Sequence, residues 1–128
     1  MNIKWKYTEK VDVKQLEVIE RYFNIILPRD YKNILNECNR GKPEPARFDI
    51  SNRKECIIDY MINLEDIIKI SNNIKDIKMI PIATDPFGNI VGYIISDNKI
   101  GSINFWNHED KDITLVASSF KNFLEKFY

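Results

Sequence analysis

Hydrophobic residues recur at helical spacing in the first third of the chain and predict two helices. The first spans residues 13–23 and follows Asp12, whose carboxylate can accept hydrogen bonds from backbone amides of the first turn. Its apolar face comprises Val13, Leu16, Ile19, Tyr22 and Phe23. The second begins at Leu27-Pro28. Proline suits the first position of a helix, because the N–H that it lacks would be unpaired there in any case. It carries Tyr31, Ile34, Leu35 and Cys38 and is predicted to end at Gly41 in a left-handed cap.

The middle of the chain has a mixed pattern. Residues 46–50 predict a strand with Phe48 and Ile50 on one face. Residues 56–62 predict a second strand, although adjacent apolar pairs blur its alternation. Asn63 can then cap a helix. That helix carries Leu64, Ile67, Ile68 and Ile74.

The second half of the chain alternates clearly and predicts a sheet. The expected strands are 79–84, 90–96, 100–107 and 113–117. Their connections are short, so neighbouring strands must be antiparallel, since a parallel crossover needs a dozen residues or more. Ser118 or Ser119 then caps a closing helix that carries Phe120, Phe123, Leu124 and Phe127. Helices, then a central antiparallel sheet, then a C-terminal helix is the order of an α+β fold.

Length and composition limit the possibilities. The 128 residues suit one domain spanning 1–128, and 44% hydrophobic residues are typical of a globular chain. The 19 basic and 19 acidic residues cancel, which disfavours direct nucleic-acid binding. No run reaches the roughly 18 apolar residues of a membrane helix, and the first residues lack the apolar core of a signal peptide. We therefore expect a cytoplasmic protein in which Cys38 and Cys56 are reduced, buried thiols.

Reactive side chains are scarce. His108, Glu109, Asp110 and Asp112 cluster in one predicted turn, but structural zinc needs about four ligands, mostly nitrogen or sulfur, and this chain has one histidine and no paired cysteines. No serine elbow or glycine-rich phosphate loop is present. We predict no cofactor, no metal and no enzymatic activity. A hydrolase that uses a carboxylate pair stays open as an alternative, although no spacing selects a pair.

Two predicted turns, 85–89 and 108–112, are the best candidates for a functional surface, with Trp106 between them. Adjacent strands would gather their acidic and aromatic groups at one edge of the sheet, and interfaces favour aromatic anchors within a polar surround. The candidate contact residues are Asp85, Asn89, Trp106, His108, Glu109 and Asp110. Ordinary turn chemistry is the alternative explanation, because Asp, Pro, Gly and Asn are common turn residues.

Four segments stand in an order that resembles one family. They are Leu27-Pro28-Arg29-Asp30-Tyr31 with Asn39-Arg40-Gly41, Ile80-Pro81-Ile82-Ala83 with Asp85 and Gly88-Asn89, Gly101-Ser102-Ile103-Asn104-Phe105-Trp106-Asn107-His108-Glu109, and Ser119-Phe120-Lys121-Asn122-Phe123-Leu124. This pattern is similar to that of the SMI1/KNR4 (SUKH) superfamily, from Leu16 to the end of the chain. Pro86-Phe87 replaces a more usual glycine-rich tip, and Asn107 stands where aspartate is usual.

The resemblance implies an α+β fold with a central antiparallel sheet. It also implies a frequent bacterial role, that of an immunity protein which binds and neutralises a cognate polymorphic toxin through the toxin's C-terminal domain. A regulatory or scaffolding binding protein is the alternative that the resemblance leaves open. In either case we expect a monomer or a weak homodimer.

Overall fold

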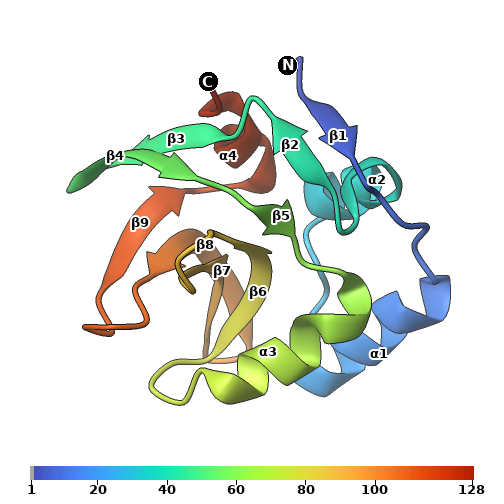
Figure 1. Ribbon diagram of the computed structural model, residues 1–128. Helices are drawn as coiled ribbons and strands as arrows, with labels where there is room; N and C mark the ends of the chain where they lie inside the picture. Colours follow the sequence, from blue (N-terminus) through green and yellow to red (C-terminus); the bar gives the residue numbers. More distant parts are fainter. Residues whose placement is uncertain (1) are drawn as a thin grey trace.

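A five-stranded antiparallel sheet forms the centre of the computed structural model, which describes residues 2–128 (Figure 1). Its strands lie in chain order, so each pairs with its predecessor as expected from the short connections. They are β5 (Tyr60–Met61), β6 (Met79–Thr84), β7 (Ile90–Ser96), β8 (Lys99–Trp106) and β9 (Ile113–Ala117). The predicted α+β fold is confirmed.

Four further strands form two antiparallel pairs. β1 (Lys4–Lys6) pairs with β2 (Lys42–Glu44), and β3 (Arg47–Ile50) pairs with β4 (Arg53–Ile57). The single strand predicted over 56–62 is wrong, because this segment divides between β4 and β5. The chain changes partner there: the Ile58 amide donates to Ala46, whereas the next amide, of Asp59, donates to Thr84.

Two of the helices begin at caps that the sequence predicts. The Asp12 carboxylate accepts from the Lys14 amide at 3.0 Å, and the Ser119 hydroxyl accepts from the Asn122 amide at 3.1 Å. The helices are α1 (Val13–Phe23), α2 (Arg29–Cys38), α3 (Ile67–Asn73, after a 3₁₀ turn at Leu64–Asp66) and α4 (Phe120–Glu125). The predicted left-handed cap at Gly41 is wrong, since Arg40 adopts that conformation, with φ of 64°.

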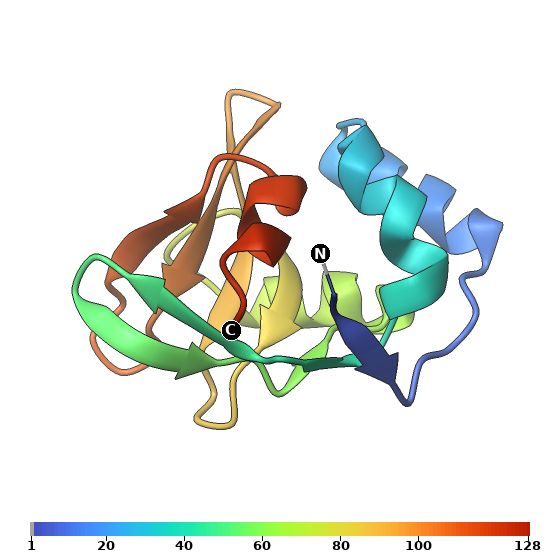
Figure 2. The same cartoon turned by 90° about the horizontal axis from the view of Figure 1, so that it is seen from above.

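The main core lies between one face of the sheet and the helices α2 and α4. Figure 2 shows α4 between the sheet and the α1–α2 pair. Aromatic rings fill this layer: Tyr31 packs against Tyr93, with ring centroids 6.0 Å apart, and Phe123 packs against Phe48 at 5.6 Å. Cys38 and Cys56 are buried and unbridged, as predicted, and burial raises the pKa of the Cys38 thiol to about 12.

A second, smaller core covers part of the opposite face of the sheet. It comprises Ile74, Met79, Ile90 and Trp106. α3 and the segment that follows it supply the cover for this face. Trp106 lies on the face of β8 opposite the main core, and this second core buries it there.

None of the helices within residues 2–128 has the length and the apolar character that crossing a bilayer requires.

Glu20 joins α1 to the start of α2 through the Leu27 amide, at 2.7 Å, and the Lys32 ammonium, at 2.8 Å. Burial tends to raise the pKa of Glu20, but these hydrogen bonds and the Lys32 charge hold it below its ordinary value. A depressed pKa stabilises the fold above the pKa of the unfolded chain, and this contribution is lost as the pH falls through the folded value.

We expect Glu20→Gln to cost about 1 kcal/mol of unfolding free energy at pH 7 and to remove part of the acid sensitivity. Urea unfolding at pH 7, 5 and 3.5 measures this, with Glu17→Gln, on an exposed position of the same helix, as the control. Wild type and Glu20→Gln should converge in stability at the lowest pH. A constant difference across the series would contradict the assignment.

Candidate partner-binding site

The turns that follow β6 and β8 lie side by side at one end of the sheet. Ile90 at the start of β7 pairs with Trp106 at the end of β8, so residues next to them in the two turns are neighbours. Residues 85–89 and 107–112 together are called the two-turn platform below. Because the strands run antiparallel, the register brings together segments that are about 20 residues apart in the sequence.

A chain of hydrogen bonds locks the two turns together. The Asp85 carboxylate accepts from the Phe87 and Asn89 amides through Oδ1, at 2.9 and 2.8 Å, and from Asn89 Nδ2 through Oδ2, at 2.8 Å. Asn89 Oδ1 in turn accepts from the His108 amide at 3.1 Å and lies 2.8 Å from His108 Nδ1. The structure thus joins three of the predicted site residues in one network.

Asp85 and Asn89 use their polar atoms within the chain. Their exposed fractions are 8% and 4%, and each side chain bonds to neighbouring turn residues. Gly88 lies between them with φ of +93°, a conformation that side chains rarely adopt, and the His108 ring packs against it. In this structure Asp85 and Asn89 shape the platform and have little surface with which to contact a partner.

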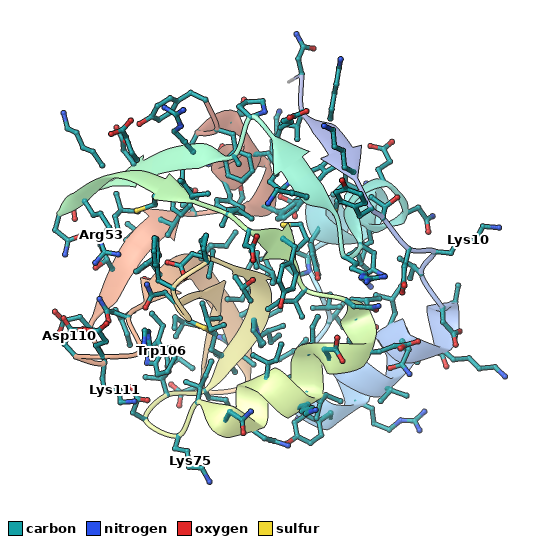
Figure 3. All side chains as sticks on the ribbon, in the orientation of Figure 1. Lys10, Arg53, Lys75, Trp106, Asp110 and Lys111 are labelled. Atoms are coloured by element: carbon teal, nitrogen blue, oxygen red, sulfur yellow. The ribbon has the colours of Figure 1, made fainter. Side chains whose placement is uncertain are left out.

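Trp106 is buried under the platform. It is 6% exposed, and its Nε1 donates to Asp76 Oδ2 at 3.1 Å. The Lys111 ammonium lies 5.0 Å from the centroid of its ring, a cation–π distance. Figure 3 shows Trp106, Asp110 and Lys111 at one end of the molecule, with Lys10 at the other. Trp106 therefore offers a partner almost no surface, and its contacts connect the platform to the segment before β6.

The exposed side chains of the platform include one large aromatic residue and several carboxylates. Phe87 is 70% exposed at the tip of the first turn, and Glu109 and Asp110 are exposed on the second. His108 is partly exposed. The sequence reasoning omitted Phe87 from the candidates, although a large apolar residue at the tip of a Pro/Gly turn was a usable signal.

Asn107 and Asp110 hold the acidic turn in shape. Asn107 Oδ1 accepts from the Glu109 amide, and Asp110 Oδ1 accepts from the Asp112 amide, both at 2.9 Å. These bonds are Asx turns, which fix a short loop without neighbouring support. The backbone that carries Glu109 and Asp110 is thus defined, and each of the two side chains keeps carboxylate oxygen free for a partner.

A small hollow of about 100 Å³ separates this turn from the β3–β4 hairpin. Its walls include Arg53, Asp110 and Asp112, and the Arg53 guanidinium lies 5.4 Å from the centre of the Phe105 ring. Figure 3 shows Arg53 and Asp110 on the same side of the molecule. Sites for small ligands are typically about 300–1,000 Å³, so this hollow suits a side chain better than a substrate.

Larger hollows lie elsewhere. One of about 560 Å³ opens between α1 and the segment after α3, and another of about 420 Å³ lies beside Tyr7 and Tyr60. Within residues 2–128, no group of three or more His, Cys, Asp or Glu side chains is placed to hold a metal ion. The platform is thus a shaped surface and not a closed cavity.

Comparison with known proteins gives one finding. The model of the family described as SMI1-KNR4 cell-wall matches residues 13–124, from the start of α1 into α4. The match covers most of the chain and includes both turns of the platform. A comparison with curated proteins gave no match.

Proposed function

The chain belongs to the SMI1-KNR4 family, which includes toxin immunity proteins, and we propose that it is an immunity protein of this kind. In this proposal it binds the C-terminal domain of a cognate bacterial toxin in the cytoplasm and neutralises it by recognition, without turnover. The observation that carries the proposal is the two-turn platform, a hydrogen-bonded surface that exposes Phe87 together with Glu109 and Asp110.

Phe87 has the properties of a binding hot spot. An aromatic side chain that is 70% exposed contributes little to the stability of the fold, yet it can bury a large apolar area against a partner. Hot spots are usually such anchors, surrounded by polar groups that exclude water once the complex forms. The hydrogen bonds beneath Phe87 reduce the entropy that the turn would lose on binding.

Glu109 and Asp110 give the platform an acidic rim. Charges of this kind contribute mainly to the rate of association and to the choice of partner. They favour a partner with a basic surface, and a basic active cleft on the toxin would be covered directly by this rim. The neutral charge of the whole chain means that this preference is local to the platform.

A carboxylate-pair hydrolase remains the enzymatic alternative. It would need a pocket that excludes water around two acids. The hollow beside Asp110 and Asp112 is about 100 Å³ and also contains Arg53, which favours recognition as the role of these acids. A regulatory or scaffolding role would use the same platform with a different partner, and only a binding experiment separates it from immunity.

The test of the proposal is to find a toxin domain encoded in the gene next to that of this chain and to co-express the two. We expect survival of the host cell, co-purification of the two chains, and loss of both effects on platform substitution. Phe87→Ala should weaken binding by about 30-fold, equivalent to about 2 kcal/mol. Glu109→Lys with Asp110→Lys should slow association by about tenfold, and less at high salt.

Two control variants are available on distant surfaces. Tyr7→Ala removes an aromatic side chain that is 76% exposed near the N-terminus, and Glu17→Lys reverses an exposed charge on α1. Both should bind as wild type. If the toxin domain does not bind, immunity is rejected. If binding is tight but Tyr7→Ala weakens it and Phe87→Ala does not, the platform is the wrong surface.

A further inference from the structure

His108 is the single histidine of the chain, and the platform fixes its ring in one orientation. Nδ1 lies 2.8 Å from Asn89 Oδ1, and the His108 amide binds the same oxygen at 3.1 Å. The ring packs over Gly88, where a side chain would come within 3.3 Å of it. Because the ring is held at one edge and on one face, its second nitrogen, Nε2, points in one defined direction.

The buried network decides which nitrogen carries the proton. Asp85 Oδ2 can only accept, so the Asn89 atom 2.8 Å from it is the amide nitrogen, and the oxygen of Asn89 faces His108. That oxygen also can only accept, and therefore His108 Nδ1 must donate. The neutral ring is then protonated at Nδ1, and its lone pair lies at Nε2.

Nε2 is the atom left for a partner. No hydrogen bond to it exists within residues 2–128, and His108 is partly exposed beside Glu109. We propose that Nε2 of neutral His108 accepts a hydrogen bond from a cationic side chain of the bound protein, a lysine ammonium or an arginine guanidinium. This inference rests on the proposed function and assigns a specific acceptor within the platform.

The sign of a pH effect follows from the change that protonation makes at Nε2, within surroundings that contain charges of both signs. Asp85 faces the ring through Asn89, the same turn carries Glu109, Asp110, Lys111 and Asp112, and the segment packed on Trp106 carries Lys75, Asp76 and Lys78. Protonation turns Nε2 from an acceptor into a donor and adds a positive charge opposite the partner's cation. The complex should therefore weaken as the pH falls from 8 to 5.

The same protonation leaves the platform intact. Nδ1 donates to Asn89 in both the neutral and the charged ring, so the bond between the two turns is retained at either pH. A loss of binding at acid pH would thus arise at Nε2 and not from opening of the two turns.

Nitrogen NMR of the free protein tests the first half of the inference. Because the chain has one histidine, the imidazole ring signals of the ¹⁵N-labelled protein come from His108 alone. At pH 8 we expect the proton on Nδ1 and an unprotonated Nε2. An Nε2–H tautomer, or a mixture of both, would overturn the proposal whether or not a partner is known.

Affinity measurements with the toxin domain test the second half. His108→Gln places an acceptor oxygen near the position of Nε2 but does not titrate, whereas His108→Asn reaches only the position of Nδ1. Wild type should lose about tenfold in affinity or more between pH 8 and pH 5, which is the effect of one lost charge-assisted bond. Gln should bind with the same affinity at pH 8 and at pH 5 within a few-fold, and Asn should bind about tenfold more weakly than wild type at pH 8.

The outcomes separate this inference from the proposed function. A tight complex with equal affinity for Asn, Gln and wild type at every pH would reject the role of Nε2 and leave immunity standing. Absence of any complex would reject both. A pH dependence that persists in His108→Gln would come from the partner's own groups and would also reject the role of Nε2.

Discussion

Phe123→Ala is expected to lower the free energy of unfolding by about 3–5 kcal/mol, a large share of the roughly 5–15 kcal/mol available to a domain. Phe123 is fully buried on α4 and packs edge-to-face on Phe48 and Phe127, with ring centroids at 5.6 and 4.9 Å. Removing its ring takes away apolar burial and leaves a cavity that the neighbouring side chains cannot fill without moving. Urea unfolding monitored by circular dichroism measures the loss.

Phe87→Ala is the matched control for this prediction. It makes the same chemical change at a position that is 70% exposed, so it should alter stability by less than about 0.5 kcal/mol. The two variants should thus differ in their effects. Phe123→Ala should unfold at a lower urea concentration than wild type, whereas Phe87→Ala should fold normally but bind weakly. Equal stability of the two variants would mean that α4 does not pack on the sheet as described.

Asp85→Ala is expected to destabilise the two-turn platform by about 2–4 kcal/mol. The carboxylate accepts three hydrogen bonds while only 8% exposed, and its removal leaves the Phe87 and Asn89 amides without that acceptor. Asn89 would then lose its orientation toward His108, and the two turns would separate. The variant should bind the toxin domain poorly even when the rest of the sheet is folded.

Hydrogen exchange distinguishes this local effect from global unfolding. In Asp85→Ala the amides of Phe87, Asn89 and His108 should exchange faster than in wild type. The amides of β6 and β7 should keep their wild-type exchange rates. Asp97→Asn is the control, since Asp97 lies exposed in the turn between β7 and β8. Unchanged protection of these three amides would show that the carboxylate does not hold the turns together.

Local patterns were enough for the helices and for four strands of the central sheet, whereas β1 and β2 were not predicted. The predicted ranges 13–23, 79–84, 90–96 and 113–117 agree with α1, β6, β7 and β9 at both ends. Each is bounded by residues that act locally: a capping Asp12, or turn residues with short polar side chains. The antiparallel order followed as well, because short connections allow no other pairing.

Errors arose where a distant segment determined the outcome. The run 56–62 looked like one strand, yet it pairs first near Ala46 and then with β6. At the end of α2, Arg40 and not Gly41 takes the left-handed conformation, and Gly41 lies against Thr8, whose Cγ2 would be 2.9 Å from an added Cβ. No feature within either segment indicates these neighbours.

The sequence by itself determined the helices, four strands of the central sheet, the antiparallel order of those strands and the kinds of residue in the two turns, because periodicity, caps and turn chemistry act over a few residues. Only the tertiary structure decided which of those residues remain at the surface. Alternation places Trp106 on a face of β8 but does not say that the segment after α3 covers that face. The register of β7 against β8 buries Asp85 and Asn89 against His108 and leaves Phe87 exposed, because side chains 20 residues apart meet only when the strands pair.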